Sequence, residues 1–400
     1  MRKIRIIFIT KFVKGIHSYT GGMETHIDDL IKELKKDELY ELSIITSKSP
    51  DGKSFEERDG VKIYYADESI GRNPLSRYKF FKSVVRKLKE IHYKEKFDLI
   101  HIQSDFGMGY FQYMKKKLPV ISTVHGTTFN EFNGSIKAKP YLLPIWLIAL
   151  PFYYLSEKNM LKSSDKVICV SDVVRNSLLS QYRFLPARKL KTILNGVDLN
   201  VFKKENNPKT KEIRNKFASK DDFLLLSGGN IIKQKGYNVI INAMPEIIKK
   251  NRKVKLVIVG DGDYLGELKK IVQKKKLENN VFFTGRIPRE DLINYYSASN
   301  CFVFPTLRGE GLPYVLIEAM ACGNVVLTTP NGGTDLVTRK NGALVNPKNQ
   351  SEVIESVLKI SSDKSFYKKI LTQTKKDVKE KCDLGKMVRE NKEIYEALLK

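Results

Sequence analysis

The 400-residue sequence predicts an α/β fold made of two Rossmann-like domains in tandem. Short β-branched runs alternate with amphipathic stretches along the chain, and the series starts afresh shortly after residue 200. The length also exceeds what one hydrophobic core normally supports. With 42% hydrophobic and 29% charged residues, the composition is typical of globular proteins.

The first series predicts a mostly parallel sheet. A strand at 4–9 precedes a helix at 23–34, and further strands are expected at 42–46, 61–65, 99–102, 120–124 and 166–170. The apolar run at the start is bracketed by Arg5 and Lys11 and is too short for a signal peptide. We therefore expect a first domain that ends near residue 200.

The second series follows a polar stretch at 202–211, which has the composition of a linker. Strands are expected at 223–226, 254–259, 281–283, 301–304 and 325–328, with helices such as 237–250 and 312–322. Ligands of open parallel sheets bind at the carboxyl ends of the strands, so we expect a site in the loops there, in a cleft between the two sheets.

Charge narrows the class of partner only partly. The chain has 71 Lys+Arg against 45 Asp+Glu, a net charge of +26. This charge attracts nucleic acid, anionic lipid or phosphorylated substrates. Alternatively, the lysines only keep helix faces solvated. No RNP-like aromatic signature, zinc-finger spacing or Arg-rich tract is present, so no nucleic-acid partner is expected. The four cysteines lie far apart and indicate neither a zinc site nor a disulfide framework: Cys169, Cys301, Cys322 and Cys382.

One strongly apolar segment, residues 141–155, holds the only tryptophan. It is flanked by three lysines, Lys137, Lys139 and Lys158. The segment is too short to span a bilayer, and Pro144 and Pro151 are expected to break a continuous helix. Two alternatives remain, a packed segment and an interfacial patch that contacts membrane headgroups.

The passage FPTLRGEGLPYVLIEAMACGNVVLT, residues 304–328, runs from a strand through a glycine-bearing loop into a helix. Pro313 suits the first turn of that helix, whose free N–H groups would suit a phosphate. Glu310 and Glu318 are eight residues apart, about 12 Å along a helix axis, roughly the span from a ribose to a hexose across a diphosphate. Carboxylates accept hydrogen bonds from such hydroxyls. Alternatively, Glu310 caps the helix and Glu318 pairs with a basic neighbour.

This passage resembles the E-x7-E signature of the retaining family 4 glycosyltransferases of GT-B fold. The likeness continues in order along nearly the whole chain, through GGMETHIDDL, FDLIHIQ, TVHG, NGVDLNVF, GGNIIKQKGY, VGDGD and FTGRI. The resemblance implies that Glu318 holds the donor ribose, that Glu310 contacts the transferred sugar, and that Lys235 faces the diphosphate. A cation there is also sensible because negative charge develops on the leaving diphosphate.

The resemblance implies catalytic roles for His125, Lys235 and Glu310, and donor binding by Gly21, Gly22, Lys235, Arg286, Glu310, Gly311, Leu312 and Glu318. His125 should lie beside the reacting sugar without being a general base, although a lone histidine is more often a packed polar residue. The pair Gly21-Gly22 could equally form a plain turn, and Arg286 could be a solvated charge.

Two features depart from the family. Asn230 stands where an arginine is frequent, which leaves open whether Lys233 compensates, and Asp335 stands where a glutamate is usual.

The triplet at 261–263, DGD, resembles the metal motif of the other large glycosyltransferase fold, which is not a tandem of two similar domains. As a dinucleotide fingerprint this stretch is one residue too long, and no acidic residue ends the next strand, so a dehydrogenase is not expected.

The reaction implied is transfer of a hexosyl unit from a UDP- or GDP-sugar to a glycan or lipid-linked acceptor, with retention of configuration and without a metal or other cofactor. Residues 1–200, with a C-terminal helix at about 385–400, would form the acceptor side, and residues 201–384 would bind the donor. We expect a cytoplasmic protein, either free or peripheral on an anionic inner membrane face. The alternatives are a sugar-nucleotide epimerase of the same fold and a non-catalytic polyanion-binding protein.

Overall fold

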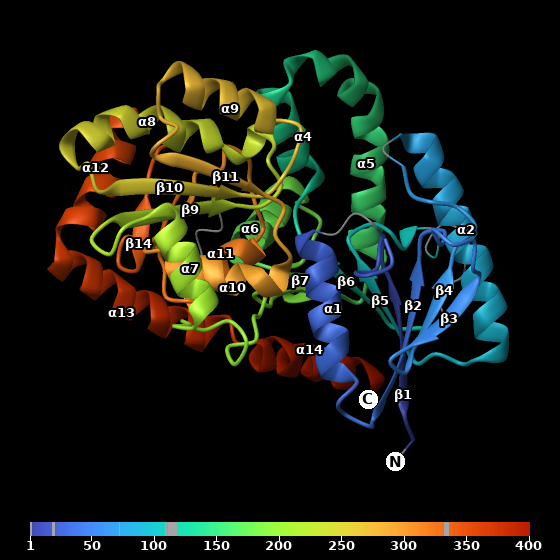
Figure 1. Cartoon of the computed structure of the whole chain (residues 1–400). Helices are drawn as coiled ribbons and strands as arrows, with labels where there is room; N and C mark the ends of the chain where they lie inside the picture. The colour runs from blue at the N-terminus through green and yellow to red at the C-terminus, as the bar shows by residue number, and fades with distance from the viewer. Residues whose placement is uncertain (1, 18–20, 72, 109, 111–117, 332–335) are drawn as a thin grey trace. The chain divides into compact units, whose positions relative to one another are not determined.

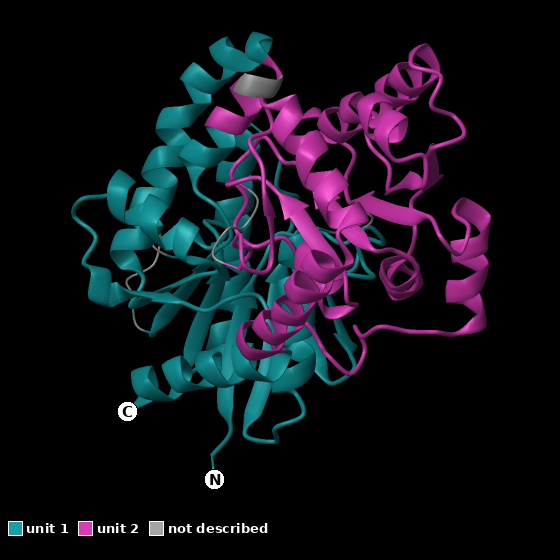
Figure 2. Ribbon diagram, turned by 90° about the vertical axis from the view of Figure 1, so that its left-hand side faces the viewer, with its two compact units in different colours: residues 1–132, 140–195, 384–400 teal, residues 133–139, 196–383 magenta. Residues whose placement is uncertain are grey.

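The computed structural model describes residues 2–17, 21–71, 73–108, 110, 118–331 and 336–400 (Figure 1). The chain forms two compact units (Figure 2). Unit 1 comprises Met1–Phe132, Pro140–Asn195 and Leu384–Lys400, and unit 2 comprises Asn133–Lys139 and Gly196–Asp383. Each unit holds a largely parallel sheet with helices, which confirms the predicted class of two Rossmann-like domains.

The sheet of unit 1 has the order β3-β4-β2-β1-β5-β6-β7-β8 among the described residues. Its strands are β1 (Ile4–Ile9), β2 (Tyr40–Thr46), β3 (Phe55–Arg58), β4 (Val61–Tyr65), β5 (Leu99–Gln103), β6 (Val120–Val124), β7 (Lys166–Cys169) and β8 (Leu190–Thr192). Neighbouring strands are parallel except β3 and β4, which are antiparallel. Strand β3 was not predicted from the sequence, because this exposed edge strand, FEER, lacks an apolar pattern.

The core of unit 1 lies on both faces of this sheet. Ile7 and Ile9 of β1 pack with residues of α2 (Pro74–Lys94), α5 (Leu143–Ser163) and α6 (Asp172–Gln181). Ile6 and Phe8 pack with residues of α1 (Gly22–Leu34) and α14 (Leu384–Leu399). Successive strand residues point to opposite faces, so a continuous apolar run is what a strand covered on both sides requires.

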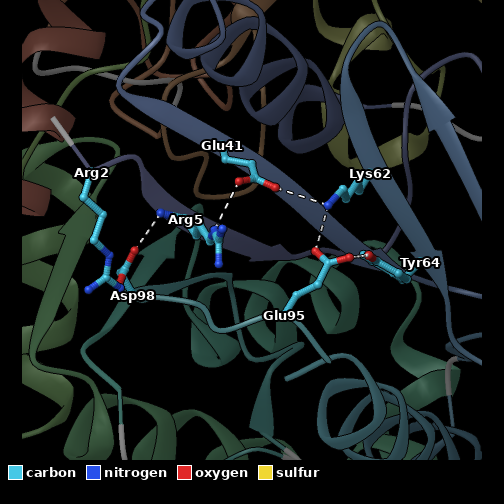
Figure 3. Close-up of polar contacts among 7 residues, drawn as sticks. All are labelled: Arg2, Arg5, Glu41, Lys62, Tyr64, Glu95 and Asp98. Carbon is cyan, nitrogen blue, oxygen red and sulfur yellow. Dashed lines mark hydrogen bonds and ion pairs between the residues drawn. The ribbon is translucent and has the colours of Figure 1, made fainter. Parts of the chain in front are cut away.

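A network of charges joins the amino ends of these strands (Figure 3). Glu41 accepts hydrogen bonds from Arg5 at 3.1 Å and from Lys62 at 3.2 Å, and Lys62 also reaches Glu95 at 2.9 Å. Burial raises the pKa of Glu41, but Lys62 and Arg5 outweigh it and leave that pKa below its ordinary value. The network is partly exposed and adds little stability per pair. It lies at the opposite ends of the strands from their carboxyl ends, where open parallel sheets bind ligands.

The sheet of unit 2 has the order β11-β10-β9-β12-β13-β14, with parallel neighbours. Its strands are β9 (Phe223–Gly228), β10 (Val254–Val259), β11 (Val281–Gly285), β12 (Cys301–Phe304), β13 (Val325–Thr328) and β14 (Gly342–Leu344). Its helices are α7 (Pro208–Phe217), α8 (Tyr237–Lys250), α9 (Leu265–Lys274), α10 (Arg289–Ala298), α11 (Tyr314–Ala321), α12 (Gln350–Ser362) and α13 (Lys364–Lys381). The stretch 202–211 is therefore not all linker, because Asn207 caps α7 and Pro208 opens it.

Each sheet has a point where the strand order reverses. In unit 1 it lies between β1 and β5, and in unit 2 between β9 and β12. Loops that leave neighbouring strands in opposite directions open a crevice at such a point, which is where open α/β sheets bind ligands. In each unit separately, we therefore expect the candidate site residues in the loops near its own reversal point.

The expected break in the apolar segment is wrong. Helix α5 runs without interruption from Leu143 to Ser163, with Pro144 in its first turn and Pro151 inside it. A first-turn proline removes no intrahelical hydrogen bond, and Pro151 removes one in a helix of 21 residues. Among the described residues, no helix has the length and apolarity needed to cross a membrane.

Candidate functional site

In unit 2, the loops after β9 and β12 bring Lys235 and Glu310 together. The Lys235 ammonium donates a hydrogen bond to Glu310 Oε1 at 2.8 Å and lies 4.8 Å from the centre of the Phe304 ring. The Leu307 N–H donates to the Gln234 carbonyl at 2.8 Å, so the two loops are joined by backbone as well. The structure thus places two of the residues singled out in the sequence at the reversal point of the sheet.

Glu310 is a buried, ionised carboxylate. Lys235, Arg308 Nε at 3.1 Å and Thr306 Oγ1 at 3.3 Å all reach the same oxygen, Oε1. Burial pushes the pKa of Glu310 upward, but the charges of Lys235 and Arg308 outweigh it and leave that pKa below its ordinary value. The described residues place no donor on Oε2, which leaves that oxygen able to accept hydrogen bonds from a ligand.

Glu318 on α11 is the second carboxylate, and it is 2% exposed. Its Oε1 accepts a hydrogen bond from Arg289 Nε at 2.7 Å, and its Oε2 accepts one from the Tyr296 hydroxyl at 3.2 Å. The Arg289 guanidinium lies 5.0 Å from the Phe202 ring centre and 5.4 Å from that of Tyr314. Arg289 and Tyr296 were not predicted from the sequence, because nothing in their local pattern shows that they reach α11.

The other unit 2 residues expected at the donor site follow strands β11 and β12. Arg286 follows β11 and is exposed, three residues before Arg289. Gly311 and Leu312 are buried between Glu310 and α11. Asn230 and Lys233 are both exposed after β9, and Asp335 lies outside the described residues. Pro313 caps α11 instead of occupying its first turn.

In unit 1, the pair Gly21-Gly22 stands at the start of α1, which begins at Gly22, and does not form a plain turn. Gly21 precedes the helix, and its N–H donates to Glu24 Oε2 at 2.8 Å. This bond satisfies a backbone donor that precedes the helix.

His125 follows β6 and forms a hydrogen bond through Nε2 with Gln103 Oε1 at 2.8 Å. Its ring centre lies 5.0 Å from that of His26, whose Nδ1 is 3.0 Å from Asn195 Oδ1. Gln103 ends β5, at the reversal point of this sheet. His125 was predicted from the sequence, but the polar partners that hold it were not.

Burial keeps the histidines of this region uncharged. It lowers the pKa of His26 to about 4 and of His101 to about 3, and it lowers that of His125 well below its ordinary value. His101 bonds to the Tyr395 hydroxyl at 2.8 Å and to Thr123 Oγ1 at 2.7 Å, so it ties α14 to the sheet. His125 is therefore a hydrogen-bonding group without charge at neutral pH.

We expect His101 to make the stability of the chain depend on pH. The unfolded chain takes up a proton on this residue below pH of about 6.5, whereas the folded chain does not, so stability falls as pH decreases, by up to about 1.4 kcal/mol per pH unit. In His101→Gln, the stability measured by urea unfolding should fall less steeply between about pH 6 and 4.5, by up to about 1.4 kcal/mol per pH unit. Tyr395→Phe removes the hydrogen bond but keeps the titrating ring, so its pH dependence should match the wild type; a variant His101→Gln with unchanged pH dependence would contradict the assignment.

The acidic triplet at 261–263 has local partners. Asp261 Oδ1 accepts the Gly262 N–H at 2.8 Å, and Asp263 pairs with Lys139 at 2.8 Å. Within the described ranges, no group of three or more His, Cys, Asp or Glu is placed to hold a metal ion. The four cysteines are buried, and none of them forms a disulfide.

Comparisons with known proteins agree over both units. The family model for "Glycosyltransferase Family 4" matches residues 20–201, and that for "Glycosyl transferases group 1" matches residues 209–377. An uncharacterized glycosyltransferase of Methanocaldococcus jannaschii is 29% identical over 417 residues, with all of both chains covered. The alpha-monoglucosyldiacylglycerol synthase of Streptococcus pneumoniae is 30% identical over 321 residues, which cover 78% of this chain and 68% of that protein.

Among solved structures, the Anabaena protein HepE in complex with UDP-glucose superimposes with a TM-score of 0.75 at 18% identity, over 99% of this chain and all of that one. At that identity the likeness concerns the fold. The matches along the chain cover both units and agree with the resemblance of the motifs. This chain therefore belongs to the family 4 glycosyltransferases, which have the GT-B fold.

Proposed function

We propose that this glycosyltransferase moves a hexosyl unit from a UDP- or GDP-sugar to a glycan or lipid-linked acceptor, with retention of configuration and without an essential metal. The observation that carries the proposal is the Lys235–Glu310 pair at the reversal point of the sheet in unit 2. The UDP-glucose bound by the Anabaena neighbour supports the donor class, and the diacylglycerol-linked name of the Streptococcus relative supports a lipid acceptor.

In this proposal unit 2 binds the donor and unit 1 serves the acceptor. Glu318 accepts hydrogen bonds from the ribose hydroxyls, and Glu310 Oε2 accepts them from the transferred sugar. Lys235 balances the negative charge that grows on the diphosphate as the bond between C1 and the phosphate oxygen breaks. The acceptor oxygen attacks C1 from the face on which the diphosphate departs, and it passes its proton to the departing phosphate. Neutral His125 contributes a hydrogen bond near the sugar.

Thermal melting with UDP, GDP and ADP in EDTA tests the donor site first. One of the three should stabilise the wild type by about 2.7 kcal/mol at a hundredfold excess over Kd. Glu318→Ala should lose this response, whereas Glu355→Ala, an exposed carboxylate on α12, should keep it. No response of the wild type to any nucleotide would overturn the donor site and favour polyanion binding.

Product analysis tests the reaction itself. With a donor and an acceptor in EDTA, free nucleoside diphosphate and a glycoside of unchanged anomeric configuration are expected. An epimerised sugar nucleotide without release of the diphosphate would contradict transfer and favour the epimerase. Activity that appears only after a divalent metal is added would contradict metal independence.

Arg289→Gln is expected to weaken binding of the preferred nucleoside diphosphate about tenfold, because Glu318 loses the charged partner that orients it. The preference for the ribonucleotide over its 2′-deoxy form should shrink as well, which a general loss of stability would not cause. Calorimetry on both nucleotides measures this effect. Arg252→Gln removes an exposed arginine of the same unit as control; an unchanged ribose preference in Arg289→Gln would contradict the role.

A further inference from the structure

Unit 1 has a concentrated exposed apolar surface, here called the α2–α5 surface. Eight of the twelve exposed large apolar residues of the described chain belong to it: Leu75, Tyr78, Tyr141, Leu143, Ile145, Leu147, Ile148 and Leu155. Helices α2 and α5 lie side by side (Figure 1), with the Phe81 and Phe152 rings stacked 6.5 Å apart. An exposed apolar patch of this kind marks an interaction surface.

The first half of α5 reverses the usual amphipathic pattern. Pro144, Leu147, Ile148, Pro151 and Leu155 follow the i, i+3, i+4 spacing of one helix face, and that face is exposed. Ile148 is 80% exposed. The buried residues of α5 include small and polar ones, Ala149, Ser156 and Glu157. The packing of unit 1 therefore does not explain the apolar residues at this face.

The charges around this surface are positive. Residues 74–89 of α2 contain six Lys or Arg and no Asp or Glu. The only carboxylate of α5, Glu157, is 5% exposed and accepts hydrogen bonds from the Tyr182 hydroxyl and the Thr128 N–H. Exposed lysines remain on both helices, including Lys79 and Lys82 on α2 and Lys162 on α5. The complementary partner is apolar inside and negatively charged at its surface.

We infer that the α2–α5 surface docks this protein on an anionic lipid bilayer. The apolar residues enter the boundary between headgroups and acyl chains, and the lysines contact lipid phosphates. The exposed apolar part of α5 is about 18 Å long, too short to cross a bilayer, so it lies at the interface. A symmetric dimer through the same surface would bring like charges together. The inference concerns binding alone and goes beyond the proposed transfer reaction.

Vesicle co-sedimentation of the full chain tests the apolar contribution. Ile145→Ser/Ile148→Ser changes two exposed side chains, and we expect its partition to phosphatidylcholine vesicles with about 30% phosphatidylglycerol to fall about tenfold or more. Tyr93→Ser changes a side chain that is 88% exposed at the far end of α2 and should bind as the wild type does. Equal binding of the isoleucine variant and the wild type would overturn the inference.

The charge contribution needs a control of equal net charge. Lys158→Gln/Lys162→Gln should lower partition to the anionic vesicles about tenfold and leave the weak binding to pure phosphatidylcholine unchanged. Lys269→Gln/Lys270→Gln removes two exposed lysines from α9 in unit 2 and should have little effect. Equal losses from both pairs would show that net charge alone attracts the protein, and they would overturn the assignment to this surface.

Two further measurements separate the inference from its rivals. Sedimentation without lipid should show no self-association through this surface; a dimer that the isoleucine variant abolishes would make the surface an interface between copies and overturn the inference. Nucleotide-dependent melting of the isoleucine variant should equal that of the wild type. A failure of the donor site would then appear in melting, and a failure of membrane docking only in vesicle binding.

Discussion

Lys235→Met is expected to lower kcat/KM for transfer by about 10² to 10³, because it removes the cation that faces the diphosphate in the proposed reaction. The ammonium is held at 2.8 Å from Glu310, and the lysine side chain is only 17% exposed. A fixed charge in such a place needs no reorganisation as negative charge develops. Steady-state kinetics with the donor identified by melting measures the loss.

The same loop provides the comparison. Lys233 lies two residues earlier, in the 3-10 turn η3 (Lys233–Lys235), and is exposed. Lys233→Met should therefore change kcat/KM by less than about threefold. A loss as large as that of Lys235→Met would show that Lys233 supplies the charge that Asn230 lacks. A negligible effect of Lys235→Met would contradict the proposed mechanism.

Gly236→Ala is expected to lower the free energy of unfolding of unit 2 by about 4 kcal/mol or more. Gly236 has φ +71°, and an added Cβ would lie 2.0 Å from the Pro305 carbonyl oxygen. Left-handed backbone costs about 1–2 kcal/mol for a residue with a side chain, and the overlap with rigid backbone adds to it. The loop that holds Lys235 must also shift, so transfer activity should fall with stability.

Two other glycines separate the contributions in urea unfolding. Gly285 has φ +74° with no atom within 4 Å of an added Cβ, so Gly285→Ala should cost only the strain of about 1–2 kcal/mol. Gly266, in α9, has neither a positive φ nor a close neighbour, and Gly266→Ala should stabilise by about 0.5–1 kcal/mol. Equal losses in Gly236→Ala and Gly285→Ala would show that the approach to Pro305 relaxes without cost.

The local sequence pattern predicted strands correctly where the residues of the strand are also buried. The run at 4–9 and the run at 254–259 were expected as strands and form β1 and β10. Short strands with little apolar pattern, such as β3 and β14, were missed because pairing with a neighbouring strand stabilises them. The two prolines of α5 wrongly predicted a broken helix, because the neighbouring turns of a long helix tolerate the loss of one hydrogen bond.

For the candidate site, the motifs identified Glu310, Glu318 and Lys235. They did not show which of these residues are in contact. Their separation along the chain reaches 75 residues for Lys235 and Glu310. Arg289 had no local signal, because its role depends on α10 and α11 packing side by side. Similarly, Gln103 and His26 contact His125 only once β5, β6 and α1 are assembled.

The sequence by itself determined the class of fold and the family. The alternation of strand and helix patterns, the turn residues and the spacing of motifs are local properties, and they favour the same local structure wherever they occur. Only the tertiary structure decided which charges pair, which histidines are kept neutral, and which face of α5 is exposed. These depend on distances and desolvation between residues remote in the chain, and the sheet order that brings them together is fixed by packing of the whole unit.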